Sequence, residues 1–155
     1  MRITILSVGK VKEKFYRDAI LEFSKRLSRY CKLEIIEVAD EKTQEEASET
    51  EIRLVKEKEG ERILKAIQDN MFVYALAIEG KSMDSVAFSE EINRKGIEGQ
   101  SNIAFVIGGS LGLSEQVYQR ADKQISFSKM TFPHQLMRVI LLEQIYRGYR
   151  IMNHE

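Results

Sequence analysis

Short apolar runs alternate with amphipathic stretches along the whole chain. A nearly continuous apolar run of four to eight residues is typical of a strand buried in a parallel sheet. Between the runs, apolar residues recur every three or four positions, which is the spacing of a helix with one buried face. The runs predict strands over 3–8, 33–38, 71–78, 102–107 and 124–127. The spaced positions predict helices over about 15–30, 48–67, 84–95, 114–121 and 134–151.

Several polar and glycine residues mark where these elements begin, weaken or end. Ser48 followed by Glu51 predicts a capping box at a helix start. Gly60 interrupts that helix pattern at a cost of roughly 1 kcal/mol relative to alanine. Gly96 is expected to end the next helix, and residues 79–81 are expected to form a turn. The alternating order predicts an α/β fold with a mostly parallel sheet flanked by helices, in one domain over 1–155.

Composition narrows the class without naming a function. Hydrophobic residues make up 43% of the 155 residues, as in an ordinary globular domain. The start of the chain is not a signal peptide, and no apolar stretch approaches the roughly 20 residues of a membrane span. Cys31 is the only cysteine, so a cytoplasmic location is expected. His134 and His154 are too few and too far apart for zinc, so no metal is expected.

The net charge of zero hides a segregation of charge. Residues 1–32 hold nine Lys and Arg against three acidic residues. A basic face of this kind can follow a nucleic-acid backbone, but a solvated helix face explains it about equally well.

The last predicted helix carries more apolar surface than one face requires. Its apolar residues, from Leu136 to Tyr149, wrap much of the cylinder. A second buried face at a subunit interface explains the excess, and a helix sunk deep in a single-domain core is the alternative.

Two turns are candidate binding segments because they follow strand ends, where open α/β sheets bind ligands. The glycines of Gly108–Gly112 would let the backbone approach a ligand, although the pattern is neither GxGxxG nor a P-loop and equally suits a tight turn. The segment 126–134 mixes hydroxyl and apolar side chains, which suits an adenosine with a thioether tail or plain internal packing. His134 is a candidate general base or a structural residue.

Several segments together resemble the bacterial 23S rRNA pseudouridine N3-methyltransferases, which belong to the SPOUT class of α/β-knotted enzymes. The resemblance extends over essentially the whole chain, in order and with similar spacing. It is carried by ILSVGK at 5–10, KEGERIL at 58–64, ALAIEGK at 75–81, FVIGGSLGL at 105–113, ISFSKMTFPHQLMRVILLEQIYR at 125–147 and NH at 153–154.

The resemblance implies a C-terminal deep trefoil knot, a homodimer, and S-adenosyl-L-methionine (SAM) bound by knot loops. The implied substrate is a pseudouridine in 23S rRNA within the assembled ribosome. Carried over by position, the SAM contacts are Leu76, Gly108, Phe127, Ser128, Lys129, Met130, Thr131 and Phe132.

The catalytic residue stays open at this point. Arg138 and Arg147 join His134 as candidates, for contact with an rRNA phosphate or with the base, although either arginine can equally form a structural ion pair; Glu143 lies four residues before Arg147. Relatives in this family continue with Pro-Tyr-His and a basic residue where this chain ends at Asn153-His154-Glu155. This difference leaves a catalytically weak, SAM-retaining rRNA- or ribosome-binding module as an alternative to the enzyme. A further alternative is a nucleotide-binding regulator that uses the Gly108–Gly112 loop.

Overall fold

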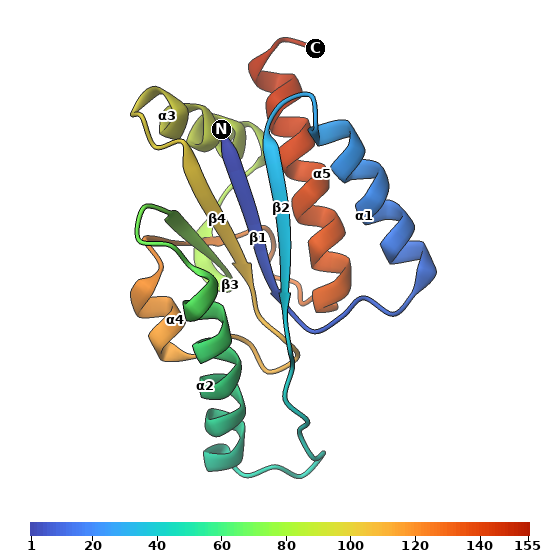
Figure 1. Cartoon of the computed structure of the whole chain (residues 1–155), viewed down its shortest axis with the longest axis vertical. Coiled ribbons are helices and arrows are strands. Elements are labelled where there is room, and N and C mark those ends of the chain that lie inside the picture. Colours follow the sequence, from blue (N-terminus) through green and yellow to red (C-terminus); the bar gives the residue numbers. More distant parts are fainter.

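The computed structural model describes residues 1–155 and contains five strands and five helices that alternate from end to end (Figure 1). Each strand falls where an apolar run predicts it, so the α/β prediction is confirmed. The strands are β1 (Arg2–Val8), β2 (Lys32–Val38), β3 (Phe72–Ser82), β4 (Asn102–Ile107) and β5 (Lys123–Ser126). The helices are α1 (Lys14–Leu27), α2 (Glu49–Ala66), α3 (Ser85–Ile97), α4 (Glu115–Arg120) and α5 (His134–Met152).

The five strands form one sheet in the order β2-β1-β4-β3-β5, and every neighbouring pair is parallel. All carboxyl ends therefore lie at the same edge. The loops after β1, β3, β4 and β5 are brought together there although they are far apart in the chain.

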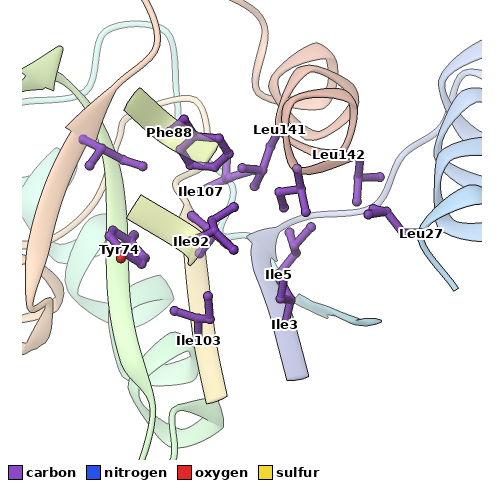
Figure 2. Close-up of a cluster of buried hydrophobic side chains, with 13 residues drawn as sticks. Ile3, Ile5, Leu27, Tyr74, Phe88, Ile92, Ile103, Ile107, Leu141 and Leu142 are labelled. Carbon is purple, nitrogen blue, oxygen red and sulfur yellow. The ribbon is translucent and has the colours of Figure 1, made fainter. Parts of the chain in front are cut away.

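One face of the sheet is covered by α1, α3 and α5. Figure 2 shows Phe88 and Ile92 of α3 and Leu141 of α5 turned toward the sheet residue Ile107. Tyr74 and Phe105 stack within the same core, with their ring centroids 5.1 Å apart. This face holds the larger of two buried clusters.

The opposite face is covered by α2 and α4, which lie side by side in Figure 1. Gly60 is the reason these two helices can approach closely. A Cβ atom at this position would lie 2.3 Å from the Ser114 hydroxyl oxygen, well inside van der Waals contact. The glycine that weakens α2 as an isolated helix therefore allows its packing against α4.

Two local predictions are wrong. Residues 79–81 form no turn: β3 continues to Ser82 after a bulge between Leu76 and Lys81, because both halves pair with β5. Helix α3 passes Gly96, and Gly99, at φ +85°, provides the left-handed residue just after the helix.

Helix α5 packs against α1, α3 and the sheet. This placement favours the deep-core explanation for much of its apolar surface, since the helix has neighbours on three sides. Leu136, Val139 and Ile140 are only half-buried. The trefoil knot and the dimer interface stay predictions. None of the helices has the length and apolar character needed to cross a membrane.

Candidate functional site

A cavity of about 770 Å³ opens at the carboxyl edge of the sheet, between the ends of β3, β4 and β5. Its volume is in the range of small-molecule and cofactor sites. More than half of its lining residues are hydrophobic, and its walls come from the β3 bulge, residues 107–113 and residues 125–134. A ligand here would meet apolar side chains and the exposed backbone of a glycine loop.

The loop Gly108–Gly112 closes tightly on itself. The N–H of Gly112 donates to the carbonyl oxygen of Gly109 at 3.0 Å, and Gly112 has φ +90°. A Cβ atom at Gly108 would lie 2.8 Å from the carbonyl carbon of Gly112. Glycine is required at 108 by the loop's own backbone, whereas the sequence pattern suggests space for a ligand as the reason.

The bulge in β3 provides the second wall. Leu76 is the last residue paired before the bulge, and pairing with β5 resumes at Lys81. The residues between them leave the ladder, and Ala77, Ile78 and Glu79 line the cavity. Gly80 is needed because a Cβ atom there would lie 2.7 Å from the Ile125 backbone.

The third wall is the segment after β5, which is held by short-range hydrogen bonds. The Ser126 hydroxyl donates to the Ser128 carbonyl oxygen at 3.0 Å, and the Met130 N–H donates to the Ser128 hydroxyl oxygen at 2.9 Å. The Phe127 ring packs edge-on against Phe88 at 5.1 Å. Met130, which lines the cavity, is 72% exposed.

The structure brings together seven of the eight residues that the resemblance assigns to SAM. Lys129 is the exception, since it is exposed and does not line the cavity. The seven that line it are Leu76, Gly108, Phe127, Ser128, Met130, Thr131 and Phe132. Together they line one cavity, while SAM binding by them stays a prediction.

Among the catalytic candidates, only His134 borders the cavity. It is the first residue of α5 and is half-buried. Burial, and then the nearby charge of Arg138, lower the pKa of its imidazole. Its Nδ1 atom is buried and has no hydrogen-bond partner. A neutral imidazole with a free nitrogen is suited to accept a proton or a hydrogen bond.

Both arginine candidates form structural contacts, which was the alternative explanation for them. The Arg138 guanidinium is buried and donates to the carbonyl oxygens of Val8 and Gly9 at 2.8 and 2.9 Å. It also pairs with Glu37, so it ties α5 to the ends of β1 and β2. Arg147 is exposed and pairs with Glu143, its Nε donating at 2.9 Å.

A second cavity of about 610 Å³ adjoins the first and shares Gly109, Ser110 and His134 with it. Its other walls come from residues 8–12, 37–41, Glu59 and Gln135. The sequence patterns did not reveal it. Its trace in the sequence is the segment KEGERIL at 58–64, which contains Glu59 and contributes to the family resemblance.

A comparison with known protein families identifies the class of protein to which this fold and cavity belong. The family described as "Predicted SPOUT methyltransferase" matches residues 1–155, so the chain belongs to the SPOUT methyltransferase family. A solved structure of a probable methylase family protein from Haemophilus influenzae Rd KW20 matches 98% of this chain and 66% of that one, with TM-score 0.52 and 10% identity. That likeness supports the fold.

Curated relatives are closer in sequence. The chain is 64% identical over 155 residues to "Ribosomal RNA large subunit methyltransferase H" of Clostridium tetani, covering all of this chain and 98% of that protein. A protein of the same name from Bifidobacterium adolescentis is 64% identical over 151 residues, covering 97% of this chain and 95% of that protein.

Proposed function

We propose that this chain transfers a methyl group from SAM to N3 of a pseudouridine in 23S rRNA. Membership of the SPOUT methyltransferase family makes it a SAM-dependent enzyme, and relatives of this identity are named large-subunit rRNA methyltransferases. Within the structure, one observation carries the proposal: the first cavity is lined by seven of the residues predicted to bind SAM. Turns separated by about 20 residues converge there with the β3 bulge and line an open cavity of cofactor size.

The residues around this cavity fit SAM in their chemistry. Leu76, Phe127 and Phe132 offer apolar contact for an adenosine, and the glycine loop offers backbone polar groups. SAM supplies a methyl group on a positively charged sulfur, which leaves as a neutral thioether when a deprotonated N3 attacks. The chain's task is therefore to position both reactants and to favour loss of the N3 proton.

His134 is our candidate for handling that proton. It lies on the wall between the two cavities, and its lowered pKa keeps the imidazole neutral near pH 7. Its buried Nδ1 has no protein partner to compete for a proton. Arg138 and Arg147 rank below it because their guanidinium groups are held by carboxylates or carbonyl oxygens.

The proposed partners are a second copy of the chain and the assembled ribosome, which places the enzyme in the cytoplasm. The half-buried residues Leu136, Val139 and Ile140 on α5, together with the exposed Met130, offer apolar surface for the dimer. The exposed basic residues Arg17, Lys25 and Arg29 of the α1 region have no ion-pair partner and are available to RNA phosphates.

Two measurements on the full chain test this function. Titration calorimetry should show binding of SAM but not of NAD or GTP. Transfer of radiolabelled methyl groups should occur to ribosomes that lack the modification, and His134→Gln should reduce its rate by about 10²-fold with little change in SAM affinity. Binding of SAM without transfer by the wild type would favour the catalytically weak alternative, and no SAM binding would contradict the proposal.

A further inference from the structure

The second cavity contains a buried carboxylate whose second oxygen has no partner. Glu59, on α2, is 5% exposed and lines the cavity. Its Oε2 accepts a hydrogen bond from the Glu41 N–H at 3.0 Å. Its Oε1 makes no hydrogen bond and faces Gly109, where a Cβ atom would lie 3.3 Å from it. This oxygen is not one of the partnerless atoms that are shielded from solvent, so it is open to the cavity and free to accept a hydrogen bond from a ligand.

The other charges around the cavity do not satisfy Glu59. Glu37 and Glu41 are each paired with an arginine, Arg138 and Arg62 respectively. Asp40 and Glu59, the other acidic residues of the lining, form no ion pair with an arginine or a lysine. The lining also contains Lys10 and Lys12, which are exposed and form no ion pair. The cavity thus combines a carboxylate acceptor with unpaired cations at its exposed lining.

Two further acceptors around this cavity are also free. The His134 Nδ1 and the Gln135 Oε1 atoms are buried without hydrogen-bond partners, and both residues line the cavity. A ligand with several N–H groups would satisfy such acceptors. A nucleobase is of this kind, and the lysines suit its phosphate.

We propose that the second cavity receives the target pseudouridine and that Glu59 Oε1 accepts a hydrogen bond from its N1–H. This inference rests on the proposed function and extends it to the base that is recognised. Pseudouridine differs from uridine at this edge, since it presents N1–H where uridine presents a C–H group. The carboxylate therefore favours pseudouridine, because bound uridine would displace solvent from Oε1 without offering it a donor.

The arrangement of the ring agrees with methylation at N3. N1 and N3 lie on either side of the C2 carbonyl, so a ring that directs N1–H toward Glu59 directs N3 away from it. The shared wall of Gly109, Ser110 and His134 separates this cavity from the proposed SAM cavity. Glu59 is thus assigned to specificity, and proton removal from N3 is left to the side that faces His134.

Nucleotide binding tests the assignment without relying on turnover. The amide resonances of the full-length, isotope-labelled protein are followed by NMR with S-adenosylhomocysteine present. Pseudouridine 5′-monophosphate should shift the amides of Lys12, Gly109 and Ser110, and uridine 5′-monophosphate should bind about tenfold more weakly. 1-Methylpseudouridine 5′-monophosphate, which lacks the N1–H donor, should bind no better than uridine 5′-monophosphate.

The matched variants are Glu59→Gln and Glu61→Gln, the latter on the exposed side of α2. In Glu59→Gln, the Glu41 N–H keeps its hydrogen bond to the side-chain oxygen at position 59. The amide NH₂ group then faces the ligand in place of Oε1. This variant should lose the preference for pseudouridine, and Glu61→Gln should keep it.

Three results would overturn the inference: equal binding of all three nucleotides, shifts confined to the SAM cavity, or no shifts at millimolar pseudouridine 5′-monophosphate. The nucleotide comparison needs no variant, so it decides the matter even if Glu59→Gln fails to fold. A wild type that binds SAM and methylates ribosomes while failing here would leave the proposed function intact. A wild type that fails with SAM would contradict the function itself.

Discussion

Single positions decide whether the proposed SAM site can form, and Gly108 is the clearest case. Gly108→Ala should shift the loop 108–112, because its Cβ atom would lie 2.8 Å from the Gly112 carbonyl carbon. We expect a loss of about 1–3 kcal/mol in the free energy of unfolding, by analogy with overpacked cores, and a SAM affinity lowered at least tenfold. Chemical denaturation and calorimetry measure the two effects.

Gly96→Ala is the matched control. Gly96 lies within α3 at a normal helical φ, and a Cβ atom there would meet only the flexible end of Met1, at 3.5 Å. Alanine should therefore raise the free energy of unfolding by about 0.5–1 kcal/mol and leave SAM affinity unchanged. Equal SAM affinity in Gly108→Ala and the wild type would show that the loop does not form the site.

The sequence shows which residue types follow the strand ends, but it does not show the contacts that require them. The glycines of 108–112 mark a turn in any local analysis, whereas the contact that requires Gly108 exists only in the folded loop. Glu59 shows the limit more strongly. In the sequence it is one acidic residue in a charged helix, and only the packing of α2 beside Gly109 buries it.

Among the elements, α3, β3 and β5 are joined by one buried carboxylate. Glu91 of α3 accepts hydrogen bonds from the Tyr74 hydroxyl at 2.9 Å and from the Lys123 ammonium at 3.1 Å. Burial of Glu91 raises its pKa, but the hydrogen bonds from Lys123 and Tyr74 outweigh this effect, so the pKa is lowered overall. The ionised form is thus favoured in the folded state.

A lowered pKa makes this contribution depend on pH in a definite direction. The stabilisation is fully present above the pKa of glutamate in the unfolded chain, about 4.3, and is lost as pH falls through the lower folded value. Glu91→Gln should therefore cost about 1–3 kcal/mol at pH 7, and the difference from wild type should shrink below about pH 4. Thermal unfolding against pH measures it, with the exposed Glu90→Gln as control. A difference that stays constant down to pH 3 would contradict the assignment.

The elements themselves were largely predictable, because apolar runs and helical spacing are local features. The bulge in β3 was not, since it depends on pairing with β5, which lies more than 40 residues later in the chain. That bulge creates one wall of the cavity. Local pattern therefore located two of the cavity's walls and misplaced the third as a turn.

For the molecule as a whole, the order of the strands matters more than any motif. Parallel pairing in the order β2-β1-β4-β3-β5 brings the ends of β3, β4 and β5 to one edge. The sequence alone suggested this edge through strand-end loops and through resemblance to a family. It could not show that two adjoining cavities share the Gly109–Ser110 wall.

Dimer formation is the prediction that concerns the entire chain. The mass by sedimentation velocity should be about twice the 18.0 kDa of one chain at micromolar concentration. Met130→Asp adds a charge to a side chain that is 72% exposed, and it should shift the equilibrium toward monomer if the rim of the cavity lies at the interface. Lys129→Asp, at an exposed neighbour outside the cavity lining, is the positional control. A monomer at all concentrations would remove the subunit interface from the proposal.

The most direct test is a crystal structure of the full chain with S-adenosylhomocysteine. Adenosyl density should lie between Leu76, the turn at Gly108–Gly112 and the segment 127–132, with the sulfur directed toward the wall shared with the second cavity. Density bound elsewhere, or a cavity filled by the protein's own side chains in every copy, would contradict it.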